Sequence, residues 1–248
     1  GLVGSEMCIR DSGCIAYNNA DDGWDLFAKV QTGSIGKVTI RNCVAYKNGY
    51  VTGDDGKEID AGNGNGFKMG GDSMSGYHEL HNSIAFFNKA KGIDSNSCPD
   101  IQVFDSISFN NESYNVAFYT NSAVNTDYKA DGVISYRTEN MDQTENLKGK
   151  GTQDSSRIYG ETNFYWDVTS HTSVNSKGAT VSSDWFESLD FTGIDRNEDG
   201  TVNTHGFLIL TDKAQAGGVI GGTASEDIKI GDCLLYTSDA ADDSLRVD

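Results

Sequence analysis

Four short stretches of the chain share one pattern of apolar and polar positions. Each has a small residue, a β-branched residue, a second small residue and an aromatic residue, and each reaches an asparagine five positions after its start. The stretches begin at Cys14, Cys43, Ser83 and Ser106. Because their apolar residues alternate with others, they are predicted to be strands rather than helices. The interval of 23 residues from Ser83 to Ser106 indicates a stacked repeat.

A second strand is predicted shortly after each asparagine. In three repeats it begins four residues after the asparagine, whereas the second repeat contains an insertion of 14 residues before it. The apolar positions of this strand are Trp24, Phe67, Ile93 and Val116. The positions that follow them are Asp25, Lys68, Asp94 and Ala117. Since side chains alternate across a strand, these last four are expected to face outward in one column.

Stacked repeats of this kind predict an all-β fold, a right-handed parallel β-helix. The handedness follows from the general rule for parallel crossovers. The asparagines are expected to form a ladder at a turn, where an amide tolerates left-handed backbone geometry and bonds the coils above and below. They are Asn19, Asn48, Asn88 and Asn111. Residues 139–155 are polar and contain glycine, so we predict a long loop there.

The two ends of the chain do not follow the repeat. Residues 5–12 (Ser-Glu-Met-Cys-Ile-Arg-Asp-Ser) and the stretch that starts Cys233-Leu-Leu-Tyr both look like translated sequencing-adapter read-through. We therefore expect 1–12 and 233–248 to be non-native segments around an N-terminally truncated β-helix domain at 13–232. Ordinary frayed termini are the alternative.

The composition of the chain argues against some classes of function. The net charge is −18, which disfavours nucleic-acid binding because that needs a basic surface. No apolar run is long enough to span a membrane. An acidic solenoid with 29 glycines suits a secreted, extracellular protein, and we expect a monomer. Cys14 and Cys43 share a column with two serines, which favours small packing residues, although a bridge between stacked cysteines remains open.

Candidate chemistry gathers at the second strand of each repeat. Asp21, Asp22 and Asp25 place three carboxylates within five residues, and oxygen ligands at this density suit Ca²⁺. Lys68 lies in a glycine-rich phrase at 64–71 and, at the usual spacing of about 4.8 Å between strands, next to Asp25. The plain interpretation is a salt bridge from Lys68 to Asp25 or Asp94, which contributes little at an exposed site.

Three of these segments together resemble the family-nine polysaccharide lyases, which are pectate lyases and their relatives built on a right-handed parallel β-helix. The segments are Asn-Asn-Ala-Asp-Asp-Gly-Trp-Asp-Leu-Phe (18–27), Gly-Asn-Gly-Phe-Lys-Met-Gly-Gly (64–71) and Asn-Lys-Ala-Lys-Gly-Ile-Asp-Ser-Asn (88–96). The resemblance covers about residues 13–120 and continues more weakly into 188–208.

The resemblance implies calcium-dependent cleavage of 4-linked galacturonan, such as pectate, by β-elimination. Asp21, Asp22 and Asp25 match the family's Ca²⁺ ligands, and Lys68 matches its Brønsted base. The family uses a further aspartate from the preceding coil, which by spacing falls at or before the N-terminus. An acidic polysaccharide is the expected partner, and Asp94 and Asn96 are candidates for contact with it.

Two other function classes remain open. A β-helical glycoside hydrolase could use Asp21, Asp22 and Asp94, but Lys68 would then have no task. A non-catalytic carbohydrate-binding solenoid would leave Lys68 as a surface ion pair. The lyase is the preferred interpretation because it alone gives the lysine a role in the aspartate column.

Overall fold

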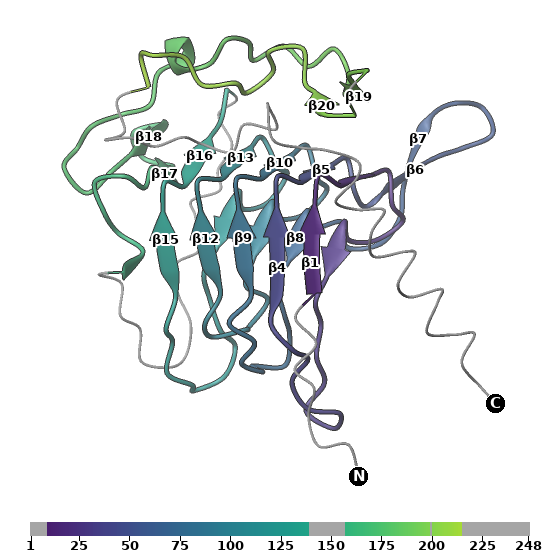
Figure 1. Ribbon diagram of the computed structural model, residues 1–248, viewed down its shortest axis with the longest axis vertical. Coiled ribbons are helices and arrows are strands. Elements are labelled where there is room, and N and C mark those ends of the chain that lie inside the picture. Colours follow the sequence, from purple (N-terminus) through teal and green to yellow (C-terminus); the bar gives the residue numbers. More distant parts are fainter. Residues whose placement is uncertain (1–8, 139–156, 199, 215–248) are drawn as a thin grey trace.

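The computed structural model describes residues 9–138, 157–198 and 200–214, and it shows a solenoid of three parallel sheets (Figure 1). The first sheet contains β1 (Ile9–Ser12), β4 (Val38–Arg41), β9 (Glu79–His81), β12 (Gln102–Phe104) and β15 (Lys129–Asp131). The second contains β2 (Ile15–Tyr17), β5 (Val44–Tyr46), β10 (Ile84–Phe86), β13 (Ile107–Phe109) and β16 (Ile134–Tyr136). The third contains β3 (Trp24–Asp25), β8 (Phe67–Lys68), β11 (Ile93–Asp94) and β14 (Val116–Ala117).

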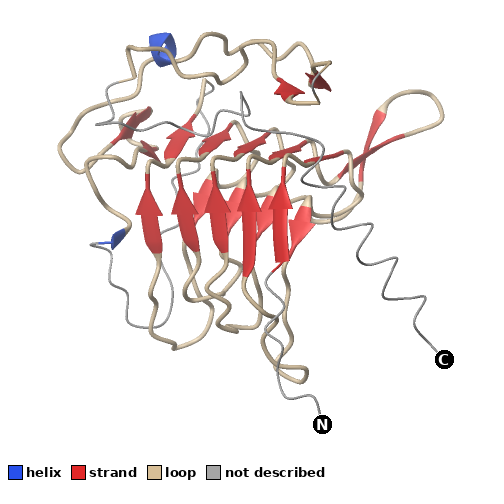
Figure 2. Cartoon of the chain, viewed as in Figure 1, coloured by secondary structure: helices blue, strands red, loops and turns tan. Residues whose placement is uncertain are grey.

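Each of the first four coils contributes one strand to each sheet, and the coil of β15 and β16 contributes to the first two sheets. The register confirms the predicted columns. In the second sheet, Ile84 pairs with Val44 on one side and with Ile107 on the other. In the third sheet, Lys68 pairs with both Asp25 and Asp94. Figure 2 shows how strongly strands dominate over helix. The all-β parallel β-helix predicted from the repeat is therefore the observed architecture.

The predicted asparagine ladder is also present, with one correction. Asn88 Nδ2 donates to Asn111 Oδ1 at 2.9 Å, and Asn48 Nδ2 donates to Asn88 Oδ1 at 2.9 Å. The left-handed backbone, however, lies one residue before each ladder asparagine. It is found at Asn18, Lys47, Phe87 and Asn110. The amides therefore stabilise the turn through hydrogen bonds between coils, and the preceding residue adopts the left-handed conformation.

The molecule has two apolar cores rather than one. Inside the solenoid, small residues such as Ala45 and Ala85 pack with Phe67 and Ile93. The branched and aromatic residues of the second sheet point the other way, and residues 181–214 cover them (Figure 1). This covering segment includes η2 (Ser183–Trp185), β19 (Asp195–Arg196) and β20 (Val202–Asn203). It follows a hairpin of β17 (Tyr165–Asp167) and β18 (Thr172–Val174).

The 14-residue insertion in the second coil forms an antiparallel hairpin of β6 (Tyr50–Thr52) and β7 (Glu58–Asp60), which projects from the solenoid (Figure 1). Lys89 Nζ, from the next coil, donates to the carbonyls of Ala61 and Gly62 at 3.3 Å each. These contacts anchor the end of the insertion just before the glycine-rich segment that carries Lys68.

Several sequence predictions meet the structure only in part. Cys43 is buried and forms no disulfide bond, so it is not bridged to Cys14. The predicted loop at 139–155 lies outside the described residues. The predicted non-native segments also lie largely outside them, although Ile9–Ser12 pairs with β4.

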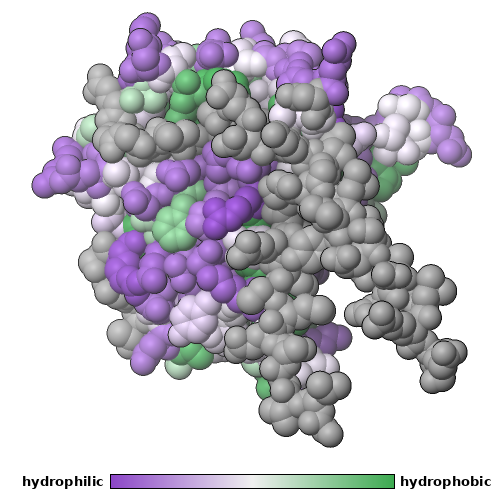
Figure 3. Space-filling view, viewed as in Figure 1, coloured by the Kyte–Doolittle hydropathy of each residue, from purple (hydrophilic) through white to green (hydrophobic). Residues whose placement is uncertain are grey.

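Within the described residues, no helix has the length and apolar character needed to cross a bilayer. The described surface in the view of Figure 3 is largely hydrophilic.

Candidate active site

The candidate site lies on the outer side of the third sheet, where two columns of side chains run across the coils. One is the predicted column of Asp25, Lys68 and Asp94. The other lies three residues earlier in each coil and consists of Asp22, Asn65 and Lys91. The backbone aligns this second column, because Gly23 N donates to Asn65 O and Gly66 N donates to Lys91 O, each at 2.8 Å.

The Lys68 ammonium bridges two carboxylates. Its Nζ lies 3.1 Å from Asp22 Oδ2 and 3.1 Å from Asp25 Oδ2. It also sits 5.3 Å from the ring centre of Phe27. The side chain is only 13% exposed, so this is not the exposed salt bridge of the plain interpretation. The expected contact with Asp25 is confirmed, and Asp22 takes the place of Asp94 as the second partner.

Asp22 is the most firmly held of the predicted metal ligands. Its side chain is 1% exposed, and its Oδ1 accepts hydrogen bonds from Asn65 N at 2.7 Å and Asn65 Nδ2 at 2.8 Å. Asp25 is 43% exposed, and its Oδ1 accepts from Phe27 N at 3.0 Å. Asp21 Oδ1 accepts from Asn63 N at 2.8 Å. Among the described residues, no group of three or more metal-ligating side chains is gathered, so the three-carboxylate calcium site stays a prediction.

Asp94 occupies its expected place in the outward column, but it is buried rather than exposed to solvent. Its side chain is 1% exposed and pairs with Lys91 Nζ at 2.8 Å through Oδ2, while its Oδ1 accepts from Asn96 N at 2.9 Å. Burial raises the pKa of Asp94, and the Lys91 charge opposes that rise. Asn96 Nδ2 donates to Gly70 O at 2.6 Å. Asp94 and Asn96 do line the pocket, but contact with substrate is not shown for either.

The charges around Lys68 set its protonation. Burial lowers the pKa of Lys68, but the hydrogen bonds and charges of Asp22 and Asp25 outweigh burial, and the net pKa is raised. The side chain is therefore a charged ammonium at neutral pH. It can act as a base only when these carboxylates are neutralised or the solution is alkaline.

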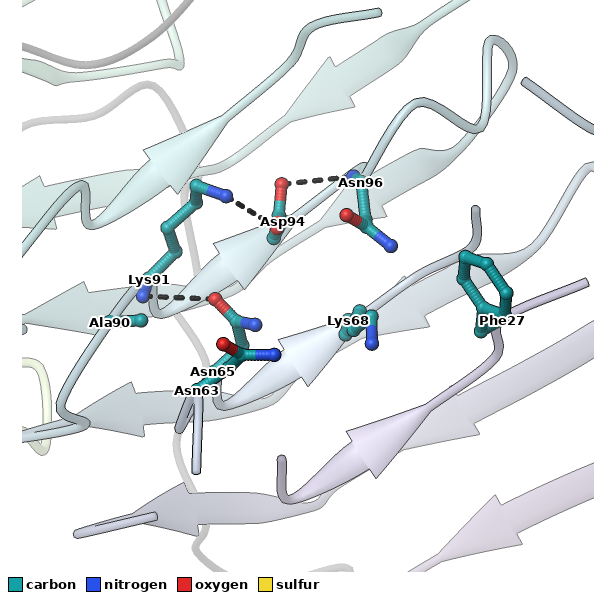
Figure 4. A pocket seen from close by; sticks show the side chains of 8 residues that line it. All are labelled: Phe27, Asn63, Asn65, Lys68, Ala90, Lys91, Asp94 and Asn96. Atoms are coloured by element: carbon teal, nitrogen blue, oxygen red, sulfur yellow. Dashed lines mark hydrogen bonds and ion pairs between the residues drawn. The ribbon is translucent and has the colours of Figure 1, made fainter. Parts of the chain in front are cut away.

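A pocket of about 360 Å³ opens at these columns (Figure 4). It is lined by Phe27, Asn63, Asn65, Lys68, Ala90, Lys91, Asp94 and Asn96. Both lysines reach it from adjacent coils, with the amides of Asn63 and Asn65 near its edge. The sequence reasoning missed Lys91, although this residue lies inside the quoted 88–96 motif. The sequence did contain a signal for it: Lys91 precedes Asp94 by three residues, as Asp22 precedes Asp25.

Glycine lets the coils approach closely behind the pocket. A Cβ on Gly66 would lie 2.6 Å from Gly92 O and 2.9 Å from Asn88 Nδ2. The strand that carries Lys68 therefore packs directly against the asparagine ladder. This contact links the rigid turn of the solenoid to the placement of the Lys68 side chain.

One prediction concerns this charge balance. Replacing Asp22 with asparagine removes a carboxylate that holds the Lys68 proton, so the pKa of Lys68 is expected to fall. An NMR titration of ¹³C-labelled lysine side chains in metal-free buffer measures this shift. Asp184→Asn, which loses a partner of Lys213 in the C-terminal segment, is the matched control. An unchanged Lys68 pKa in Asp22→Asn would contradict the assignment.

Comparisons with known proteins agree with the motifs. A family model described as "Pel9A-like, right handed beta helix region" matches residues 9–127. The chain is 38% identical over 218 residues to pectate lyase L of Paenibacillus polymyxa (strain SC2), covering 87% of this chain and 43% of that protein. It is 45% identical over 127 residues to pectate lyase L of Thermoclostridium stercorarium, covering 51% of this chain and 10% of that protein.

The fold is also similar to a solved structure. The crystal structure of pectate lyase Pel9A matches with a TM-score of 0.56 and 26% identity, covering 83% of this chain and 44% of that one. The chain thus spans less than half the length of each of these three relatives. With the motifs in register on a parallel β-helix, residues 9–127 of the chain belong to the Pel9A-like right-handed β-helix family.

Proposed function

We propose that this protein is a lyase that cleaves 4-linked galacturonan of the pectate type by calcium-dependent β-elimination, with Lys68 as the Brønsted base. The observation that carries the proposal is the Lys68 ammonium, which lines the pocket and is held by two carboxylates in the predicted register. The relatives named pectate lyase support the substrate class. An acidic extracellular polysaccharide also agrees with the proposed secretion of a monomeric protein.

Lys68 is suited to take a proton from a bound sugar. In a uronate unit, the C5 proton lies next to the C6 carboxylate, and its removal lets the 4-linked oxygen leave with formation of a 4,5 double bond. A base must be within hydrogen-bond reach and must carry a free electron pair. Lys68 meets the positional requirement because its side chain projects into the pocket, and it becomes a base when it loses its own proton.

The residues around Lys68 fit a divalent cation. Asp22 Oδ2 is buried, and the Lys68 ammonium, 3.1 Å away, balances its charge. Asp25 directs an oxygen at the same ammonium. Together with Asp21 these carboxylates offer the hard oxygen ligands that Ca²⁺ prefers. When bound, Ca²⁺ would neutralise the uronate carboxylate and stabilise the negative charge that develops on deprotonation.

From the same carboxylates we expect activity to be highest at alkaline pH. Neutralising Asp22 and Asp25 removes the influences that raise the pKa of Lys68, and burial, which lowers that pKa, then remains. The fraction of neutral lysine therefore grows as pH rises. A two-carboxylate hydrolase is less well supported, because Asp22 and Asp94 are each ion-paired to a lysine.

Ultraviolet absorbance of polygalacturonate incubated with the protein at mildly alkaline pH tests the proposal, since the product contains a conjugated double bond. We expect a rise in absorbance with Ca²⁺, no rise with a chelator and no rise on a neutral galactan. Calcium-independent binding without a new chromophore would indicate a carbohydrate-binding solenoid. New reducing ends without the chromophore would indicate a hydrolase.

A further inference from the structure

Lys91 presents a second cation to the pocket, and the proposed elimination gives it no task. Its Nζ lies 2.8 Å from Asp94 Oδ2 and 5.1 Å from the ring centre of Tyr119. The side chain is 19% exposed. Burial lowers the pKa of Lys91, but Asp94 and the Tyr119 phenol outweigh this and the net pKa is raised, so the ammonium stays charged. Because its side chain lines the pocket, this ammonium can contact a bound ligand.

The fold holds Lys91 in place before any ligand arrives. Its backbone N–H donates to Asn65 Oδ1 at 3.1 Å, which ties it to the neighbouring coil. Its carboxylate partner Asp94 is in turn oriented by Asn96 N at 2.9 Å. An ammonium has three donors, and Asp94 accepts one of them. Lys91 therefore presents a fixed positive charge with remaining hydrogen-bonding capacity.

The local charge balance distinguishes the two lysines. Lys68 contacts two carboxylates, whereas Lys91 is ion-paired with one, Asp94. Both reach the same pocket from coils that lie one strand spacing apart, about 4.8 Å. A polymer that places one uronate at Lys68 would thus bring a neighbouring carboxylate close to Lys91. Because fewer carboxylates offset its charge, Lys91 is better suited than Lys68 to bind an anion.

We propose that Lys91 binds the carboxylate of a uronate unit next to the unit that loses its proton, and that it selects ionised over methyl-esterified units at that position. Asp94 acts as a positioning residue, because it orients the ammonium while its own carboxylate is buried. This inference rests on the proposed function and adds a determinant of substrate charge. A methyl ester removes the negative charge, so it would lose the attraction to Lys91.

The variants separate recognition from folding. Lys91→Met alone leaves the buried Asp94 carboxylate without its partner, so the main variant is Lys91→Met combined with Asp94→Asn, which removes both charges. Asp94→Asn alone keeps the ammonium. Lys37→Met is the matched control, because Lys37 pairs with Glu79 at the first sheet, away from the pocket. Thermal melts verify that each variant is folded.

Calorimetric titration measures binding of oligogalacturonate and of its methyl ester with Ca²⁺ present. A Lys68→Arg background keeps the positive charge and prevents turnover, because guanidinium is not a base. We expect the double variant to bind the ionised oligomer at least about tenfold more weakly while affinity for the ester is unchanged. Asp94→Asn and Lys37→Met should retain the preference for the ionised oligomer. A wild-type preference in the double variant would overturn the proposal.

The cleavage assay separates this inference from the proposed function. With Lys68 intact, the double variant is expected to show a raised KM for polygalacturonate and a smaller change in kcat. Normal elimination by the double variant with an unchanged KM would contradict this inference but not the proposed lyase activity. If the wild type binds oligogalacturonate through Lys91 but shows no elimination, the proposed lyase activity is contradicted and the binding role of Lys91 still holds.

Discussion

Replacing Lys68 with alanine is expected to lower kcat for elimination of polygalacturonate by a factor of about 10²–10⁴, the usual contribution of a positioned general base. The physical reason is that no other amine lies beside both Asp22 and Asp25 among the described residues. KM should change less, because the loss concerns the transition state more than substrate binding. Initial rates of ultraviolet absorbance at several substrate concentrations give both constants.

Lys68→Arg supplies the sharper comparison. Arginine keeps the charge between Asp22 and Asp25 but cannot serve as a base, so kcat should fall as far as in Lys68→Ala. Lys37→Ala, which removes a lysine paired with Glu79 at another sheet, should retain wild-type kcat. An arginine variant with substantial activity would show that Lys68 acts through its charge alone, and the base would have to be sought elsewhere.

Phe86→Ala is expected to destabilise the fold by about 3–5 kcal/mol, the range for removing a buried aromatic ring. Phe86 has no exposed surface, and its ring centre lies 4.9 Å from that of Tyr46 and 4.9 Å from that of Phe207. It thus joins the stacked column of the second sheet to the C-terminal segment. Equilibrium denaturation by urea measures the free energy of unfolding, provided that the transition is two-state.

Tyr17→Ala is the matched control because Tyr17 occupies the same column in the first coil. It also stacks on Tyr46, at 4.9 Å, but it is 53% exposed and lies at the end of the stack. We expect a loss of about 1 kcal/mol or less. Equal losses for Phe86→Ala and Tyr17→Ala would contradict the view that the covering segment, rather than stacking alone, stabilises this face.

The repeat and its register were predictable from residues close together in the chain. Alternation marked the strands, and the four-residue step from the asparagine to the next strand aligned Asp25 with Asp94. Lys68 joined this column because the same glycine and apolar pattern returns after the insertion of the second repeat. The Lys91–Asp94 pair was not predicted, because the column argument followed a single face of one strand. Side chains at the turn before the strand also reach the pocket, and alternation says nothing about a turn.

The sequence by itself determined the coil, the ladder and the identity of the groups available for chemistry, since each depends on short-range spacing repeated along the chain. Only the tertiary structure decided that the branched and aromatic face of the second sheet turns away from the solenoid interior and is covered by residues 181–214. It alone decided that Lys68 pairs with Asp22 and that Asp94 is buried against Lys91. Both outcomes depend on how neighbouring coils and distant segments exclude water, and a pattern within one coil does not contain that information.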